Sequence, residues 1–217
     1  MSLITVERKV LEKNEEIAEE NRIKFSNFGN FVVNIISSPG SGKTSIIERI
    51  IAKLKNKIKI AVIEGDIQSD FDARRINALN IPVVQIVTNG ACHLDAELIR
   101  VAFDKFQEKD FKFLIIENVG NLVCPAEFDL GENLKIAVLG ITEGDDKPLK
   151  YPLVFRNSEA LIINKIDLLP HLECSIDELK KNALNINSKL KIFETSCYTG
   201  EGFDKLAQWL EEKISSI

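Results

Sequence analysis

The stretch Phe31-Val-Val-Asn-Ile-Ile-Ser-Ser-Pro-Gly-Ser-Gly-Lys-Thr44 decides the fold. It opens with a nearly continuous apolar run, which is typical of a strand buried on both faces. Gly42, Lys43 and Thr44 then match the end of the phosphate-loop pattern Gly-x4-Gly-Lys-Ser/Thr, with Ser37 in place of the first glycine. A helical pattern follows at 44–55. The order of strand, loop, Lys-Thr and helix favours a phosphate-binding loop over an ordinary glycine-rich turn.

Outside this stretch, short β-rich runs alternate with helical patterns. The runs lie at 31–36, 58–63, 82–87, 113–116, 136–139, 160–163 and 191–193, and the main helical patterns at 44–55, 95–108, 176–185 and 203–213. This alternation predicts an α/β domain of the P-loop NTPase type. We expect about seven strands in a mainly parallel sheet, with helices on both faces. Residues 4–24 read as an amphipathic helix, so we expect an N-terminal helical extension at 1–24 and the P-loop domain at 25–217.

The composition excludes several other classes of protein. The 217 residues carry a formal net charge of -5, and no basic patch stands out, which argues against a nucleic-acid partner. No run approaches the roughly 20 apolar residues that span a bilayer, and the charged N-terminus does not resemble a signal peptide. We therefore expect a soluble cytoplasmic protein without a membrane partner. Its four cysteines should be thiols.

The phosphate loop predicts a set of contacts to a nucleotide. Backbone N–H groups of the loop and of the helix start should surround the phosphates, and Lys43 should add positive charge towards the β- and γ-phosphates. The Thr44 hydroxyl is a suitable ligand for Mg²⁺. The residues expected to bind the phosphates are Gly40, Ser41, Gly42, Lys43, Thr44 and Ser45.

Two acidic segments should hold magnesium and sense the γ-phosphate. Glu117-Asn-Val-Gly120 follows a strand at the place where GTPases carry Asp-x-x-Gly, and Glu64-Gly-Asp66 follows the second strand. We assign Asp66 and Glu117 to magnesium or its waters; a strand-end helix cap is the competing interpretation, more so for Asp66 than for Glu117. Together with Lys43, these two residues are the expected catalytic residues. Gly120 should touch the γ-phosphate. Asn121 stands where a water-orienting glutamine is expected, which predicts slow intrinsic hydrolysis.

Asn164-Lys-Ile-Asp167, directly after a strand, predicts guanine as the base. Guanine offers two adjacent N–H donors to the Asp167 carboxylate, whereas adenine would present a lone pair. Asn164 can bind the other edge of the base, and the stem of Lys165 can cover the ring. Ser196 and Cys197 look like the last base-contacting loop. The expected ligands are therefore GTP and GDP with Mg²⁺.

Cys92, His93 and Cys124 form a candidate metal site. Each lies in a loop expected at the carboxyl ends of strands, where open α/β sheets bind ligands. Thiolate and imidazole suit Ni²⁺ or Zn²⁺, and a two-fold dimer could complete the ligand set. Plain packing is the competing interpretation. Because Cys124 shares a short loop with Gly120, nucleotide turnover could move a metal ligand.

Several longer segments resemble the hydrogenase nickel-incorporation GTPases, the HypB family. They are Ser38–Thr44, Glu64–Asp66, Cys92-His-Leu-Asp-Ala96, Glu117-Asn-Val-Gly-Asn-Leu-Val-Cys-Pro-Ala126, Thr142-Glu-Gly-Asp-Asp-Lys-Pro-Leu-Lys-Tyr-Pro152 and Asn164-Lys-Ile-Asp-Leu-Leu-Pro170. The resemblance implies a metallochaperone of the SIMIBI class of GTPases. Such a protein delivers nickel to the large subunit of nickel–iron hydrogenase, forms a homodimer with GTP, and works with the zinc-containing partner HypA.

The resemblance also implies roles for individual residues. Cys92, His93 and Cys124 match the metal ligands of the family. Lys147 resembles a lysine that pairs across the GTP-bound dimer, although an ordinary solvated lysine is the competing interpretation, and Asp72 lies near the switch region. The N-terminus has no His-rich stretch and no Cys-x-x-Cys motif. Residues 1–24 are then expected to dock HypA or simply to pack.

Other functions remain possible at this stage. The urease accessory GTPase also handles nickel, but its metal motif is Cys-Pro-His. A GTP-dependent interaction switch would need no metal, and its Cys and His residues would be packing residues. A small-molecule kinase is disfavoured by Asn164-Lys-Ile-Asp167.

Overall fold

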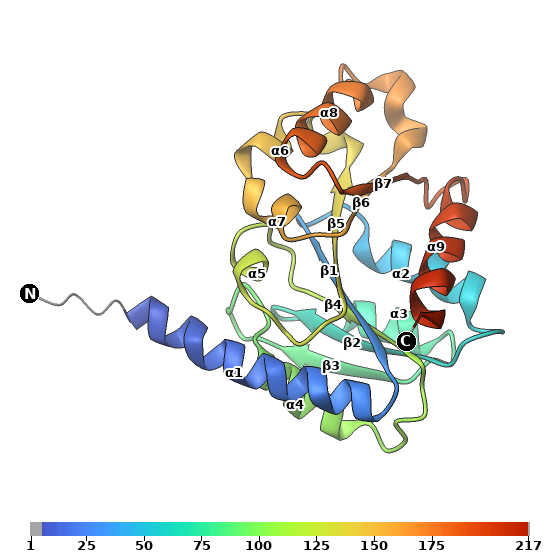
Figure 1. The fold of residues 1–217 in the computed structure, drawn as a ribbon. Helices are drawn as coiled ribbons and strands as arrows, with labels where there is room; N and C mark the ends of the chain where they lie inside the picture. The colour runs from blue at the N-terminus through green and yellow to red at the C-terminus, as the bar shows by residue number, and fades with distance from the viewer. Residues whose placement is uncertain (1–5, 217) are drawn as a thin grey trace, which may run out of the picture.

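The computed structural model describes residues 6–216, and these form an α/β domain around one central sheet. The strands are β1 (Phe31–Ser37), β2 (Ile60–Asp66), β3 (Val83–Val87), β4 (Phe113–Glu117), β5 (Leu134–Gly140), β6 (Ala160–Asn164) and β7 (Lys191–Glu194). Their order is β3-β2-β4-β1-β5-β6-β7, and every pair is parallel. This confirms the predicted P-loop NTPase fold, and it makes the sheet parallel throughout (Figure 1).

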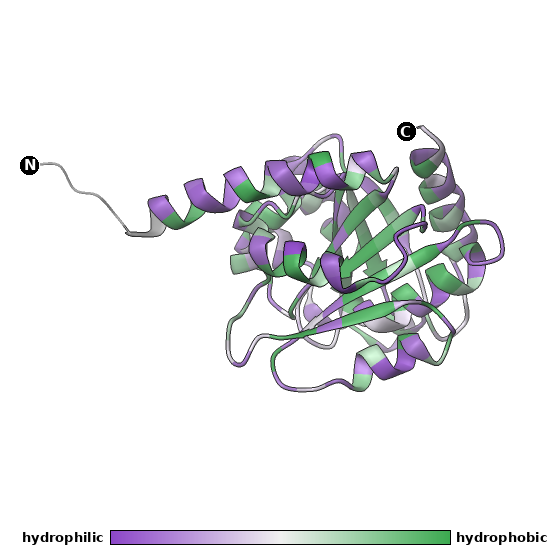
Figure 2. Ribbon diagram, turned by 90° about the horizontal axis from the view of Figure 1, so that it is seen from below, coloured by the Kyte–Doolittle hydropathy of each residue, from purple (hydrophilic) through white to green (hydrophobic). Residues whose placement is uncertain are grey.

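The strands are apolar on both faces because helices cover both. Alternate residues point to opposite faces, so Val33 and Ile35 of β1 join one core cluster while Val32 joins another. The first face packs against α2 (Lys43–Leu54), α3 (Phe71–Asn77) and α9 (Phe203–Ser215). The second packs against α1 (Val6–Asn27) and α4 (Ala96–Lys105) at one end, and α7 (Pro152–Arg156) and α8 (Ile176–Ile186) at the other. Figure 2 shows the hydrophobic strands inside this helical cover.

Helix α1 runs along α4, and its first turns project beyond the rest of the domain (Figure 1). Residues 4 and 5 of the predicted helix lie outside the described residues, as do residues 1–3 of the predicted extension. The helix continues through the predicted boundary at 24/25 to Asn27, and Phe25 belongs to the core. Asn21 is buried and donates hydrogen bonds to the Ala96 carbonyl at 2.8 Å and the Leu130 carbonyl at 3.1 Å. The division at residue 24 stays a prediction.

Short helices fill the connections between strands. They are α5 (Cys124–Glu127), α6 (Lys147–Lys150) and the 3-10 turns η1 (Ile141–Glu143) and η2 (Ile166–His171). Between residues 6 and 216, no helix is both long enough and apolar enough to cross a membrane.

Candidate functional site: a nucleotide pocket beside a cysteine–histidine cluster

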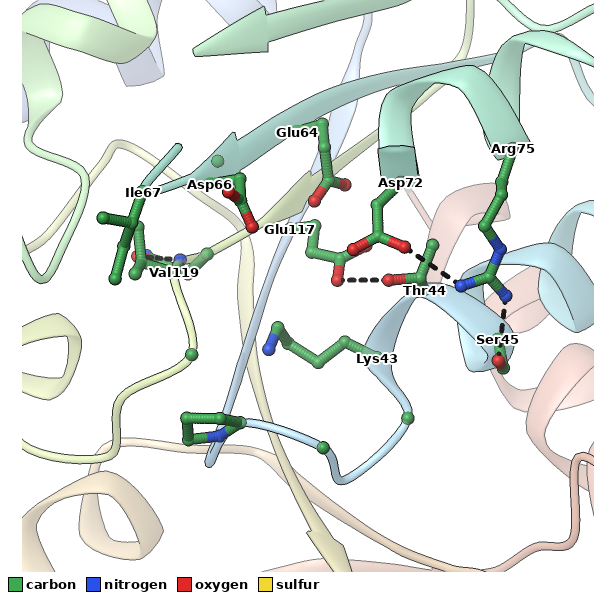
Figure 3. Close-up of a pocket in the computed structure, with 16 residues that line it drawn as sticks. Lys43, Thr44, Ser45, Glu64, Asp66, Ile67, Asp72, Arg75, Glu117 and Val119 are labelled. Carbon is green, nitrogen blue, oxygen red and sulfur yellow. Dashed lines mark hydrogen bonds and ion pairs between the residues drawn. The ribbon is translucent and has the colours of Figure 1, made fainter. Parts of the chain in front are cut away.

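The phosphate loop joins the central strand β1 to α2, as the sequence predicts. Gly42 adopts φ +98°, and a Cβ at this position would lie 2.6 Å from Asn164 Nδ2. Only glycine meets both demands without strain. Ser37, in place of the first glycine of the pattern, accepts a hydrogen bond from Lys43 Nζ at 3.0 Å. The loop and the start of α2, including Gly40, Thr44 and Ser45, line a cavity at the carboxyl end of β1 (Figure 3).

An acidic cluster forms the opposite wall of this cavity. Glu64 and Glu117 are register partners on β2 and β4, so their side chains point the same way. Thr44 Oγ1 donates to Glu117 Oε1 at 2.8 Å. Carboxylate oxygens of Glu64, Asp72 and Glu117 all lie within 4.8 Å of one another. Figure 3 shows them converging above Lys43.

Glu64 and Glu117 each keep one buried carboxyl oxygen, Oε2, without a hydrogen-bond donor among residues 6–216. Burial, together with the Glu117 carboxyl beside it, raises the pKa of Glu64 to about 11, and burial also raises the pKa of Glu117. A divalent cation would satisfy both Oε2 oxygens and favour the ionised forms. Oxygen ligands with the Thr44 hydroxyl beside them fit Mg²⁺.

Asp66 lines the same cavity, but its carboxylate is engaged elsewhere. Its Oδ1 accepts hydrogen bonds from the N–H groups of Gln68 at 2.8 Å and Ser69 at 2.7 Å. The structure thus brings Glu64 and Asp72, rather than Asp66, next to Glu117. From the sequence, the segment Glu64-Gly-Asp66 was expected at magnesium, but with Asp66 and not Glu64 as the ligand. The adjacency of two strands that both end in glutamate identifies Glu64.

One end of the cavity is built from two segments that touch. A Cβ on Gly120 would lie 3.1 Å from Pro39 Cα, so the loop after β4 lies against the phosphate loop. Arg75 of α3 is a further cavity residue that the sequence did not indicate. Its guanidinium donates to Ser45 Oγ at 3.0 Å and pairs with Asp72 at 3.0 Å. It therefore ties α3 to the start of α2.

The predicted base-reading loops lie together beside the phosphate loop. Asn164 is 1% exposed, donates to the Ser41 carbonyl at 2.9 Å, and accepts from the Cys197 N–H at 3.3 Å. Ser196 Oγ donates to Asp167 Oδ1 and so fixes that carboxylate. Lys165 adopts φ +65° and donates to the Gly40 carbonyl at 2.6 Å.

This arrangement holds the Asp167 carboxylate as an acceptor, in a loop whose Asn164 and Lys165 contact the phosphate loop. A carboxylate with one oxygen oriented by a hydroxyl can accept two adjacent N–H donors.

Cys92, His93 and Cys124 are brought together, as the sequence predicts. Their ligand atoms lie within 4.8 Å of one another, with Cys92 Sγ and Cys124 Sγ 3.1 Å apart. The His93 ring stacks on Phe128 at 4.0 Å between centroids. Burial lowers the pKa of His93, which keeps the ring neutral and able to bind a metal, while the neighbouring Cys92 raises the pKa of the Cys124 thiol. Metal binding would displace a proton from this thiol.

Comparisons with known proteins agree with the fold. Residues 31–194 match the family model described as "CobW/HypB/UreG, nucleotide-binding domain". The hydrogenase maturation factor HypB of Azotobacter chroococcum mcd 1 is 45% identical over 211 residues, covering 97% of this chain and 69% of that protein.

Two solved structures are similar over almost the whole chain. HypB from Helicobacter pylori, in complex with nickel, has a TM-score of 0.89 and 38% identity, covering 94% of this chain and 96% of that one. HypB from Archaeoglobus fulgidus has a TM-score of 0.88 and 39% identity, covering 94% and 99%. With its P-loop fold and the match at 31–194, the chain belongs to the HypB family of hydrogenase maturation factors, nucleotide-binding proteins of the CobW/HypB/UreG group.

Proposed function

We propose that this protein is a GTP-hydrolysing metallochaperone. It binds Ni²⁺ through Cys92, His93 and Cys124, and it couples GTP binding and hydrolysis to nickel insertion during maturation of nickel–iron hydrogenase. Zn²⁺ competes for the same site, because thiolate and imidazole ligands suit both ions. In this scheme nickel is the ion that is delivered, and GTP binding and hydrolysis control when it is inserted.

The observation that carries the proposal is the short path between the two sites. Glu117 lies in the nucleotide cavity at the end of β4, and Cys124 opens α5 a few residues later. Gly120, between them, packs on the phosphate loop. A loop that closes on the γ-phosphate therefore carries a metal ligand with it.

Within the nucleotide site, each group has a defined task. Lys43 and the loop N–H groups stabilise charge on the phosphates, and Asp167 and Asn164 select guanine. Mg²⁺, held by Thr44 and Glu117 with Asp66, Glu64 and Asp72 close by, would offset phosphate charge when bound. Asn121 donates to the Cys92 carbonyl at 3.2 Å, so its amide serves the metal loop and does not orient a water. Intrinsic hydrolysis is therefore slow.

The metal site also favours a dimer. Three ligands from one chain leave a tetrahedral or square-planar ion incomplete, and a second copy related by a two-fold axis supplies more. Lys147 lies 5.3 Å from the centre of the Tyr151 ring and 4.0 Å from Glu143 Oε2, half-buried and available to a second copy. HypA and the hydrogenase large subunit are the proposed partners. The reduced cytoplasm is the proposed compartment, because the thiols must stay free to bind metal.

The decisive experiment titrates Ni²⁺ into the wild-type protein and into Cys124→Ala, each loaded with GDP or with a slow GTP analogue. The matched control is Cys174→Ala, since Cys174 is also a half-buried free thiol but lies outside the cluster. We expect Cys124→Ala to lose nickel affinity and Cys174→Ala to keep it. If Cys124→Ala binds Ni²⁺ as tightly as the wild type does, the proposed metal site is wrong.

Gel filtration of the same samples tests the dimer. We expect the GTP analogue or nickel to shift the wild-type protein from monomer to dimer. A chain that stays monomeric and metal-free in all samples would instead be a plain GTP-dependent switch. A single-turnover assay completes the test, because fast GTP hydrolysis by the isolated chain would contradict the proposed role of Asn121.

A further inference from the structure

Two consecutive residues at the end of β4 point to opposite faces of the sheet. Glu117, the last residue of β4, enters the nucleotide cavity and accepts the Thr44 hydroxyl. Asn118 follows it, is 1% exposed, and contacts Asn34 and Leu94 on the face that carries α1 and α4. This alternation is what an extended backbone imposes. A displacement of Glu117 therefore displaces Asn118 on the other side of the sheet.

The Asn118 side-chain oxygen is shared between the two functional loops. It accepts the N–H of Val119 at 3.0 Å and the N–H of Leu94 at 3.2 Å. Val119 precedes Gly120 at the phosphate loop, whereas Leu94 follows the metal ligand His93. One buried oxygen thus fixes the spacing between the nucleotide segment and the metal segment.

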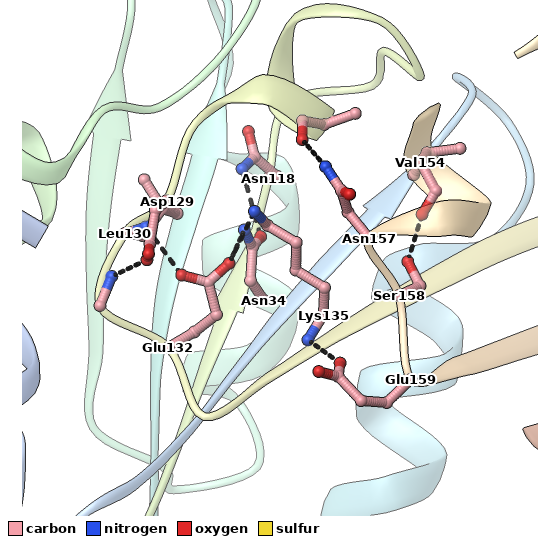
Figure 4. Close-up of polar contacts among 12 residues, drawn as sticks. Asn34, Asn118, Asp129, Leu130, Glu132, Lys135, Val154, Asn157, Ser158 and Glu159 are labelled. Carbon is pink, nitrogen blue, oxygen red and sulfur yellow. Dashed lines mark hydrogen bonds and ion pairs between the residues drawn. The ribbon is translucent and has the colours of Figure 1, made fainter. Parts of the chain in front are cut away.

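A buried hydrogen-bond chain fixes which way this amide faces. Asn118 Nδ2 donates to Asn34 Oδ1 at 3.2 Å, and Asn34 Nδ2 donates to Glu132 Oε1 at 3.1 Å (Figure 4). The other oxygen of Glu132 accepts the Leu130 N–H at 2.7 Å. Each amide turns its NH₂ along this chain towards the Glu132 carboxyl, which leaves the Asn118 oxygen for the two backbone N–H groups.

A second amide repeats the connection closer to Cys124. Asn121 Nδ2 donates to the Cys92 carbonyl at 3.2 Å, and its Oδ1 accepts the Val123 N–H at 2.9 Å. Asn121 therefore joins the backbone on both sides of the metal cluster. Leu94 adds a packing contact, because a Cβ on Gly65 would lie only 2.7 Å from Leu94 Cδ1. The metal loop is thus held against β2 and the loop after β4.

We propose that Asn118 and Asn121 form an amide clamp through which the nucleotide state sets metal affinity. When the segment Glu117 to Gly120 shifts on the γ-phosphate, the clamp moves the backbone of residues 92–94 with it. The Cys92 and His93 ligands then change position relative to Cys124. Both asparagines act as positioning residues, because their side-chain amides bind backbone groups of the two loops and Asn34. The inference rests on the proposed function, because it presumes that the cluster binds nickel and the cavity binds GTP.

The test measures the Ni²⁺ dissociation constant of the GDP form and of the slow-GTP-analogue form, by competition with a chromophoric chelator. The wild-type ratio should fall in the range of about 5–150-fold that is typical of coupled sites. In Asn118→Ala and Asn121→Ala the ratio should approach one. By linkage, saturating nickel should change the affinity for the GTP analogue by the same factor in the wild type, and by less in both variants.

Asn30→Ala is the matched control, because Asn30 is also 1% exposed and donates from its amide to a backbone carbonyl, that of Phe111. It precedes β1, at the far end of the strand from the phosphate loop. Asn30→Ala should keep the wild-type ratio even if its melting temperature falls. Should Asn118→Ala fail to fold, Asn121→Ala, half-buried in a loop, decides the question.

The outcomes separate the clamp from the proposed function. A wild-type ratio retained by both asparagine variants would overturn the clamp. So would a wild-type ratio of one with both ligands bound, although metal and nucleotide binding would then stand. A wild-type protein that binds no nickel, or no guanine nucleotide, would remove the proposed function itself.

Discussion

Asp167→Asn offers the sharpest test of base selection. Ser196 orients the Asp167 carboxylate, and the side chain is half-buried. Hydrogen bonds to a charged group contribute about 1.5–3 kcal/mol each, and partial exposure favours the lower end. Asparagine keeps one acceptor, now neutral, and turns an NH₂ group towards a guanine donor. Losing one charged bond and weakening the other costs about 2–3 kcal/mol, so GDP affinity should fall roughly 30- to 150-fold.

The same substitution should create a new preference. Xanthine carries a carbonyl where guanine carries its amino group, so the asparagine NH₂ can donate to it and affinity for xanthosine diphosphate should rise. Fluorescence competition against both nucleotides measures the exchange. Asp177→Asn is the control. It makes the same chemical change away from the cavity, at a carboxylate that is 92% exposed on α8. The reasoning is refuted if Asp167→Asn binds GDP as the wild type does, or gains nothing for xanthosine diphosphate.

Three further substitutions probe the cavity and the helix that supports it. Gly42→Ala places a Cβ at φ +98° and 2.6 Å from Asn164 Nδ2, and the left-handed backbone alone costs an alanine about 1–2 kcal/mol. GDP binding, measured by equilibrium dialysis, should therefore weaken about tenfold or more. Glu117→Gln relieves a buried carboxyl pair, so the melting temperature without Mg²⁺ should rise while Mg²⁺-stimulated hydrolysis falls; a lower melting temperature would contradict this. Asn21→Ala should cost about 1–3 kcal/mol in urea unfolding, and no loss would indicate that α1 folds apart from the domain.

The sequence predicted the elements that repeat a clear pattern. All seven strands were located to within a few residues, because a strand that is buried on both faces has a nearly continuous apolar sequence. The loops at Lys43 and Asn164 were placed for the same reason, since each follows such a run. The clustering of Cys92, His93 and Cys124 also followed, because parallel strands deliver their carboxyl-end loops to one edge of the sheet.

The sequence did not predict the register between strands or the short helices. The second strand was expected to end at residue 63, whereas β2 continues to Asp66. Glu64 pairs in register with Glu117 of β4, and Gly65 and Asp66 pair with β3. The pairing of Glu64 with Glu117 defines the acidic cluster, and no local pattern encodes it. Helix α3, which supplies Asp72 and Arg75, spans Phe71–Asn77, which is too short to display a 3.6-residue period convincingly.

The structure gives a physical reason for Ser37 in place of the first glycine of the phosphate-loop pattern. Its side chain is fully buried, donates to the Ser38 carbonyl at 2.7 Å and accepts Lys43 Nζ at 3.0 Å. A glycine could do neither. The lysine points into a cavity whose two buried glutamates have raised pKa values, because burial disfavours their charged forms. The serine hydroxyl gives this ammonium a fixed acceptor, and it holds the charge beside the phosphate loop until phosphate oxygens replace it.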